Sequence, residues 1–190
     1  MDQTKLEKMQ CLEEAVLACR NCSLCASRTQ GVFGKGSLSP TVLFVGEAPG
    51  EQEDLLGAPF VGPAGQLLDL YLEFCGLEPE DYYIANILKC RPPRNRDPLP
   101  EEEESCLPYL REQLKILQPK ILVCLGRIAA CRIISPDFRI TKQRGIWYDL
   151  GGMRVMATYH PSALLRDPAK KEEALEDFKK IAKEAQLFKK

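Results

Sequence analysis

The sequence predicts an α/β fold, a three-layer α/β/α sandwich around a central, mostly parallel sheet of four strands. Four short apolar runs alternate along the chain with segments of helical periodicity, a pattern typical of parallel strands joined by crossover helices. The runs cover residues 41–45, 82–85, 121–125 and 155–158. The chain has 190 residues, 45% of them hydrophobic, and shows no internal repeat or low-complexity linker, so we expect one domain over residues 1–190.

The helical segments each carry a local signal. Residues 4–18 place apolar side chains at helical spacing before the first strand. After that strand we expect a long loop over 46–62 and then a helix from Pro63 to about Cys75, because proline suits the first helical position and Gly76 follows its end. The other expected elements are helices over 100–117, 126–134 and 169–186 and an extra β segment over 147–150.

Composition and charge exclude a membrane protein. No apolar run is long enough to cross a bilayer, and the first residues lack the hydrophobic stretch of a signal peptide, so we expect a cytoplasmic protein. The formal net charge of −1 offers no global attraction for nucleic acid. Basic residues nevertheless gather over 89–96 and 139–144, which allows a local basic groove.

Nine cysteines in a reducing compartment indicate metal or cluster ligation, or small buried residues, because disulfides are rare there. Cys19, Cys22 and Cys25 are evenly spaced, and spacing alone leaves open which two of them bind. A zinc site is the main alternative, although fifteen residues separate Cys90 from Cys106 and zinc ribbons usually use two tight pairs. The candidates for an iron–sulfur cluster are Cys22, Cys25, Cys90 and Cys106. The cysteines that fit core patterns are Cys11, Cys75, Cys124 and Cys131.

Polar side chains follow three of the predicted strands. Glu47 lies in a glycine-bracketed turn directly after the first, Asn86 follows the second, and His160, the only histidine, follows the last. In open parallel sheets, ligands bind beyond the carboxyl ends of the strands. The sequence therefore predicts a functional site at this edge of the sheet.

Four motifs together resemble the family 4 uracil-DNA glycosylases, the iron–sulfur branch of that superfamily. They are GEAPGEQED at 46–54, GAPFVGPAG at 57–65, NILKCRPP at 86–93 and HPSALLR at 160–166. The resemblance implies the uracil-DNA glycosylase-like form of the predicted fold and hydrolysis of the N-glycosidic bond of uracil in DNA. Such hydrolysis leaves an abasic site, the first product of base excision repair. The resemblance also implies a structural [4Fe–4S] cluster on Cys22, Cys25, Cys90 and Cys106, with Cys19 a bystander.

The resemblance assigns roles to single residues as well. His160 would donate a hydrogen bond to uracil O2, and Glu47 would orient water and place negative charge near the sugar cation. A base flipped out of the DNA stack is read by stacking and by hydrogen bonds to its edge. The matching uracil-binding residues are Phe60 for stacking, Asn86 for the polar edge, Glu53 against the thymine methyl group and Ala48 through its main-chain N–H. Taken singly, three of them favour an ordinary structural role: Phe60 as a core residue, Asn86 as a strand-end hydrogen-bonding cap and Glu53 as a solvated surface charge. Only their co-occurrence favours the functional roles.

The predicted DNA contacts lie in two segments. After His160, Leu164 or Leu165 would be the apolar wedge in the minor groove, with packing beneath the final helix as the alternative for each. Phosphate contacts are expected from Arg91, Arg94, Arg96 and Arg166, and further from Lys142 and Arg144. A solvated charged face is the ordinary explanation for such a cluster.

Other functions are weighed against this one. A relative that traps uracil DNA covalently through a second histidine is disfavoured, because the chain has one histidine. An iron–sulfur electron carrier would not need polar residues after three separate strands, and a pure DNA-binding protein would retain uracil DNA without releasing base. The expected partner is uracil-containing DNA, single- or double-stranded. A monomer suffices for the task, and the sequence names no protein partner.

Overall fold

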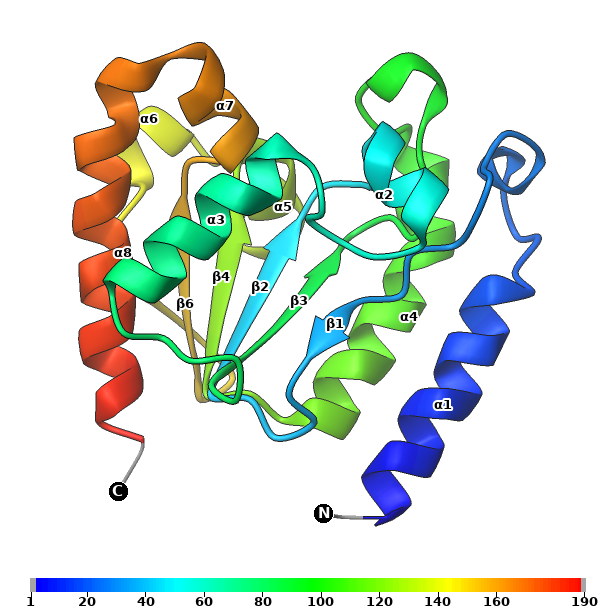
Figure 1. The fold of residues 1–190 in the computed structure, drawn as a ribbon, viewed down its shortest axis with the longest axis horizontal. Coiled ribbons are helices and arrows are strands. Elements are labelled where there is room, and N and C mark those ends of the chain that lie inside the picture. The colour runs from blue at the N-terminus through cyan, green and yellow to red at the C-terminus, as the bar shows by residue number, and fades with distance from the viewer. Residues whose placement is uncertain (1–2, 189–190) are drawn as a thin grey trace.

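A six-stranded sheet organises the protein, whose computed structural model describes residues 3–188 (Figure 1). The strand order is β1-β3-β2-β4-β6-β5. The four inner strands pair in parallel, and the two short edge strands pair antiparallel with their neighbours. The strands are β1 (Lys35–Gly36), β2 (Val42–Gly46), β3 (Tyr82–Asn86), β4 (Ile121–Leu125), β5 (Tyr148–Leu150) and β6 (Met153–Thr158).

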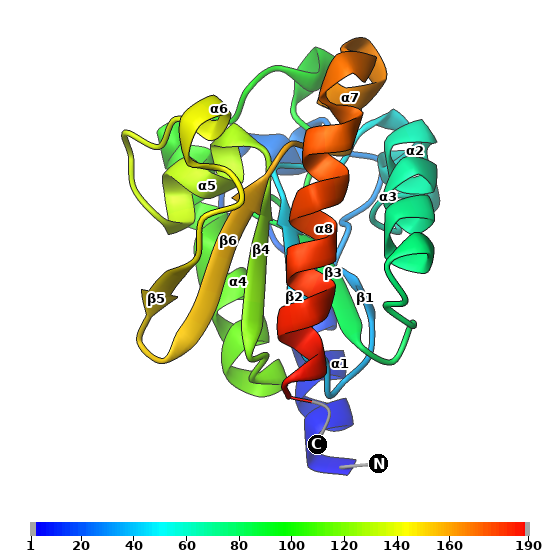
Figure 2. The ribbon, with the colours of Figure 1, turned by 90° about the vertical axis from the view of Figure 1, so that its left-hand side faces the viewer.

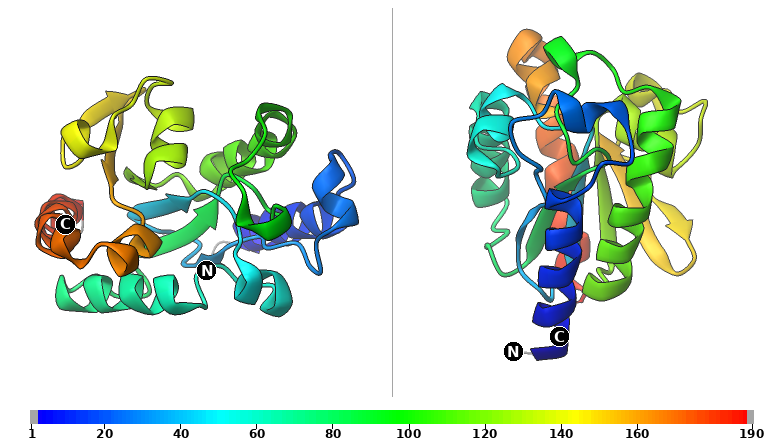
Figure 3. Two further views of the ribbon diagram at one scale, coloured as in Figure 1. Left: turned by 90° about the horizontal axis from the view of Figure 1, so that it is seen from above. Right: turned by 90° about the vertical axis from the view of Figure 1, so that its right-hand side faces the viewer.

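Helices cover both faces of this sheet, which gives the expected three layers (Figure 3). The α-helices are α1 (Gln3–Leu17), α2 (Glu51–Leu56), α3 (Pro63–Phe74), α4 (Pro100–Leu117), α5 (Arg127–Ile133), α6 (Ile140–Gln143), α7 (Pro161–Arg166) and α8 (Lys171–Gln186). Short 3₁₀ turns cover Ser23–Ala26, Pro93–Asn95 and Pro168–Lys170.

Alternation along the strands divides the core into two apolar layers. In β2, Val42 and Phe44 pack with α3 and α8, whereas Leu43 and Val45 pack with α1, α4 and α5. Successive side chains of a strand point to opposite faces, so strands covered on both faces must be apolar throughout. All residues of β2 and β4 are accordingly buried. Figure 2 shows α8 lying along one face of the sheet.

The structure confirms the predicted fold class and adds detail to it. The four predicted core strands form the parallel centre, and the expected extra β segment becomes the edge strand β5. Sequence reasoning missed β1, whose two residues carry no strand signal. It also missed the short helices α6 and α7 and the helix α2 inside the expected loop over 46–62. No helix within residues 3–188 is long and apolar enough to span a membrane.

Candidate functional site

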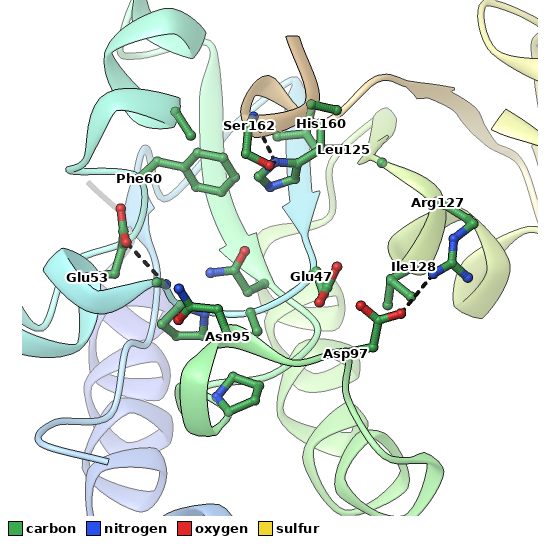
Figure 4. A pocket seen from close by; sticks show the side chains of 18 of the residues that line it. Glu47, Glu53, Phe60, Asn95, Asp97, Leu125, Arg127, Ile128, His160 and Ser162 are labelled. Atoms are coloured by element: carbon green, nitrogen blue, oxygen red, sulfur yellow. Dashed lines mark hydrogen bonds and ion pairs between the residues drawn. The ribbon is translucent and has the colours of Figure 1, made fainter. Parts of the chain in front are cut away.

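The carboxyl ends of the four parallel strands meet at a pocket of about 480 Å³ (Figure 4). Glu47 follows β2, Asn86 ends β3, Gly126 follows β4 and His160 lies two residues beyond β6. All four line the pocket. The parallel register brings them together from positions far apart in the chain, and the volume is in the range of small-molecule sites.

Glu47 has an unusual charge environment. Burial and, next, the Asp97 carboxylate raise the pKa of the Glu47 carboxyl to about 7, against the opposing effect of the Arg127 and Arg166 guanidiniums. Asp97 lies beside Glu47 and accepts an ion-pair hydrogen bond from Arg127 at 2.9 Å (Figure 4). Glu47 therefore changes protonation near neutral pH, where a general base is most effective.

His160 is a neutral hydrogen-bond donor at neutral pH. Burial, followed by the Arg166 charge, lowers the pKa of the imidazole to about 4. Its Nδ1 accepts from the Ser162 main-chain N–H at 3.1 Å and lies 2.8 Å from Ser162 Oγ. Because Nδ1 is an acceptor, the ring hydrogen resides on Nε2, which is free to donate to a ligand.

The absence of a side chain at Gly126 lets His160 occupy its position in the pocket. Gly126 has a φ of 93°, and a Cβ at that position would lie 2.9 Å from the His160 Cβ. A larger residue there would force either β4 or the imidazole away from the pocket.

Phe60 forms an aromatic wall beside the histidine. Its ring centroid lies 5.6 Å from that of His160, and the two planes are inclined by 32°. The residue has a φ of 52°, a strained backbone conformation that side chains other than glycine rarely adopt. Such strain at a pocket wall persists only where neighbouring contacts hold it, and Lys35 Nζ donates to the Phe60 carbonyl at 3.4 Å.

Asn86 presents an unpaired amide oxygen to the same space. The residue is 3% exposed, and its Oδ1 has no hydrogen-bond partner among the described residues. An unsatisfied buried polar atom costs roughly 1–3 kcal/mol, which a ligand donor would recover. Any Cβ at position 46 would collide with this oxygen and with the Phe60 ring, so Gly46 keeps the space open.

Glu53 also lines the pocket, but its carboxylate holds the backbone. Oε1 accepts from the N–H groups of Val61 and Gly62 at 2.9 Å each, and Oε2 accepts from Gly50 at 3.1 Å. These bonds tie the start of α2 to the loop that follows Phe60. The structure therefore does not show Glu53 as a solvated surface charge, which is the ordinary alternative from the sequence.

The predicted basic residues differ in availability. Arg96 makes a two-pronged ion pair with Glu102, whose side chain is 1% exposed, at 2.6 and 2.9 Å. Arg91 donates to Asn95 Oδ1 at 2.8 Å. Arg94 and Arg166 are exposed, and Arg94 has a left-handed backbone with a φ of 56°. Arg94 and Arg166 are therefore the more available of the four for a phosphate.

Two other predicted contacts are corrected by burial. Leu164 is 0% exposed and packs in the core with α3 and α8, so it cannot be a wedge in DNA, whereas Leu165 is 43% exposed. Arg144 is paired with Asp177 and Glu173 at 2.7 and 2.9 Å, which makes it a structural residue. The helical turn of α7 decides between the two leucines, because neighbouring residues on a helix face different directions.

The cysteines converge only in part. Cys22, Cys90 and Cys106 pack together with Leu24, and a small cavity is lined by these three thiols and by Cys19. Cys25 lies in the same 3₁₀ turn as Leu24 but is not among the described residues that line this cavity. No group of three His, Cys, Asp or Glu side chains within residues 3–188 has metal-binding geometry.

The surroundings of these thiols suit an anionic group. Arg28 donates to Cys90 Sγ at 3.0 Å, and the Lys89 main-chain N–H donates to Cys106 Sγ at 3.2 Å. Lys89 itself is 1% exposed, and burial lowers the pKa of its ammonium to about 8. Three converging thiols beside two cationic residues fit a thiolate-ligated cluster, which carries net negative charge.

Sequence reasoning missed several residues of this pocket. Asp97 and Arg127 pair at its lining, although neither belongs to a motif. Ser162 orients His160 and was recognised only as part of a motif. Ser162 could have been found from its position two residues after the lone histidine. Nothing local indicates the Asp97–Arg127 pair, because its members lie thirty residues apart.

Comparisons with known proteins find a matching family model and several similar proteins. A family model described as the uracil DNA glycosylase superfamily matches residues 33–185. The chain is similar to the type-4 uracil-DNA glycosylase of Archaeoglobus fulgidus, with 45% identity over 184 residues that cover 93% of this chain and 92% of that protein. It is also similar to proteins of the same name from Thermotoga maritima, with 46% identity and 86% of each chain covered, and Sulfurisphaera tokodaii, with 44% identity and 93% and 84% covered.

Proposed function

The chain belongs to the uracil DNA glycosylase superfamily, and we propose that it hydrolyses the N-glycosidic bond of uracil in DNA and leaves an abasic site. The assignment confirms the family resemblance and the fold class expected from the sequence. The observation that carries the proposal is one pocket with a neutral histidine donor, a carboxylate that titrates near neutral pH and an unpaired amide. Such an enzyme would act in base excision repair.

In the proposed mechanism, His160 and Glu47 stabilise charges of opposite sign in the transition state. As the bond to the sugar lengthens, negative charge develops on the uracil ring and positive charge on the sugar. The His160 Nε2–H donates to uracil O2 as charge grows there, without transferring a proton. The Glu47 carboxylate accepts a hydrogen bond from the attacking water, takes its proton and stabilises the sugar cation.

Recognition of the flipped base uses the walls of the pocket. Phe60 stacks on the uracil ring, and the Asn86 amide accepts from N3–H through the oxygen that has no other partner, while its nitrogen donates to O4. The Ala48 main-chain N–H provides a further donor. Glu53 acts by holding the loop beside Phe60, which narrows the space at C5 where thymine carries a methyl group.

DNA binding is assigned to the rim of the pocket. Arg94 and Arg166 contact phosphates directly, whereas Arg91 and Arg96 shape the loop over residues 90–99 and add positive potential. Leu165, the exposed leucine of α7, enters the gap left by the extruded base. A monomer carries all these groups on one chain.

A [4Fe–4S] cluster completes the proposal. Cys22, Cys25, Cys90 and Cys106 would hold it, and when bound it supplies a cross-link between the N-terminal turn, the loop over 90–99 and α4. Cys19 lines the thiol cavity as well, and it is left out because the resemblance matches the fourth ligand to Cys25. Arg28 fastens the N-terminal turn by donating to the Leu17 carbonyl and to Cys90 Sγ.

Alkali-induced strand cleavage tests the function itself. We expect DNA with a single uracil to break after incubation with the protein and alkali, and the same DNA with thymine to stay intact. Breaks occur because an abasic site, unlike an intact nucleotide, is labile to alkali. Retention of uracil DNA with no release of base would show a binding protein instead and would overturn the proposal.

The pH dependence of the reaction is set by Glu47. Because the carboxylate is the active form, kcat/KM is expected to rise with pH to about pH 7 and then to level off. Asp97→Asn removes a charge that raises the Glu47 pKa, so its acid limb should move to lower pH. Arg127→Gln removes a charge that lowers this pKa and should move the limb to higher pH. Shifts of both variants in the same direction would contradict the assignment.

A further inference from the structure

Lys89 is a buried cation whose role the pocket chemistry leaves unexplained. Its side chain is 1% exposed, and no carboxylate within residues 3–188 forms an ion pair with it. Burying an ammonium without an anion costs several kcal/mol, so natural proteins rarely do so unless a partner compensates. The lysine therefore requires a source of negative charge.

The cysteine site provides that charge. The Lys89 main-chain N–H donates to Cys106 Sγ at 3.2 Å, and the next residue is Cys90. A [4Fe–4S] cluster held by four thiolates is a net anion, because the thiolate charges exceed the charge of its core. On the other side, Arg28 reaches Cys90 Sγ at 3.0 Å. Arg28 and Lys89 both line the cavity at the thiols, so the cluster would lie beside two cationic residues.

The same ammonium contacts the main chain of a residue that lines the proposed uracil pocket. Lys89 Nζ donates to the main-chain carbonyl of Asn86 at 3.0 Å and to Gln113 Oε1 at 2.6 Å. Gln113 in turn donates to the Phe33 carbonyl at 3.0 Å. The carbonyl that the ammonium holds belongs to Asn86, whose Oδ1 has no hydrogen-bond partner within residues 3–188.

The backbone after Asn86 extends this connection to Glu47. The N–H groups of Ile87 and Leu88 donate to the carbonyls of Gly46 and Glu47, at 3.0 and 2.9 Å. The peptide group between Asn86 and Ile87, whose carbonyl accepts from Lys89, is therefore hydrogen-bonded to the turn that carries the proposed base. The same segment continues directly into the loop that carries Cys90.

We propose that Lys89 is a positioning residue that couples the iron–sulfur site to uracil recognition. Its ammonium balances the charge of the thiolate-ligated cluster, and its hydrogen bond to the Asn86 carbonyl holds the uracil-reading amide in register. The inference rests on the proposed function and adds to it a residue that touches neither the base nor the iron.

Two substitutions separate the charge from the hydrogen bond. Lys89→Met removes both and keeps the volume of the side chain. Gln113→Glu keeps the bond from Nζ to the Asn86 carbonyl, but places a carboxylate against the ammonium and so neutralises its effect on the cluster. Lys115→Met, at an exposed lysine of α4, is the matched control.

Reduction potential and excision kinetics are then measured on cluster-loaded protein. Both Lys89→Met and Gln113→Glu should shift the cluster potential to more negative values, because a nearby cation stabilises the reduced cluster. Lys89→Met should also lower kcat/KM on uracil DNA by roughly 10- to 100-fold, as is usual for outer-shell partners of a metal site, with unchanged affinity for undamaged DNA. Gln113→Glu should retain most of its kcat/KM, and Lys115→Met should change neither quantity.

The possible outcomes distinguish this inference from the function. A wild-type potential in a folded, loaded Gln113→Glu protein would overturn the charge role, even if Lys89→Met does not fold. Wild-type kcat/KM in loaded Lys89→Met would overturn the positioning role. The proposed function is tested separately, on the unmodified protein. If that protein does not excise uracil, only the proposed function is refuted, because the cluster potentials are measured without DNA.

Discussion

Replacing His160 with alanine is expected to lower the rate of uracil release by about 100- to 1,000-fold, as the loss of a transition-state hydrogen-bond donor does elsewhere. The imidazole is neutral above about pH 4, and its Nδ1 is occupied by Ser162, so its contribution is the Nε2–H alone. Alanine cannot donate to uracil O2 as charge accumulates there. Single-turnover kinetics on uracil DNA at saturating enzyme measure this step without product release.

The pH profile distinguishes this role from proton transfer. In the His160→Ala protein the acid limb near pH 7 should persist, because that limb belongs to Glu47. Disappearance of the limb would instead make His160 the titrating group. Ser162→Ala is the matched control, since it removes the hydroxyl but leaves the main-chain N–H that orients Nδ1, and its rate should fall far less.

Replacing Cys90 with serine is expected to remove the cluster and to weaken DNA binding together with stability. Cys90 lies at the start of the loop that carries Arg94, and the cluster would tie this loop to the N-terminal turn and to α4. Loss of ordered phosphate contacts should weaken affinity for uracil DNA roughly 10- to 100-fold near physiological salt and reduce its salt dependence. Absorbance of the cluster, thermal melting and binding titrations over several salt concentrations measure the three effects.

Cys11→Ser is the control for this experiment, because Cys11 is exposed and lies apart from the other thiols. It should keep the absorbance, melting temperature and affinity of the unmodified protein. Unchanged DNA affinity in a folded, cluster-free Cys90→Ser protein would show that the Arg96–Glu102 ion pair is enough to order the loop. A parallel comparison of Cys19→Ser with Cys25→Ser identifies the fourth ligand, since only a ligand substitution should bleach the protein.

The predicted elements and the observed ones agree where the local signal is strong. The strand over 121–125 is observed with those bounds, and the helix predicted over 100–117 is α4, because an apolar run between turn residues and a proline followed by carboxylates are local features. Short elements were missed because they depend on contacts with distant segments and not on a local signal. β1 exists only because residues 35–36 lie beside β3, and α2 is held in part by the Glu53 bonds to a later loop.

In the site, too, local sequence predicted some residues, while others depend on contacts between distant segments. Glu47, Asn86 and His160 were predicted from their places after apolar strands, and the structure gathers them around one pocket. The side chains of Leu164 and Leu165 look alike in the sequence, yet one is in the core and the other is exposed. The pairing of Asp97 with Arg127 and the isolation of Lys89 from carboxylates arise from contacts between distant segments.

The sequence alone determined the fold class, the family and the chemistry-bearing residue types, because apolar periodicity and short motifs are properties of neighbouring residues. The tertiary structure decided what those groups can do. It set the pKa of Glu47 near 7 and that of His160 near 4, left the Asn86 oxygen without a hydrogen-bond partner among residues 3–188 and placed a buried lysine between the cysteine loop and the pocket. Burial and charge at each of these atoms depend on side chains brought together only by folding.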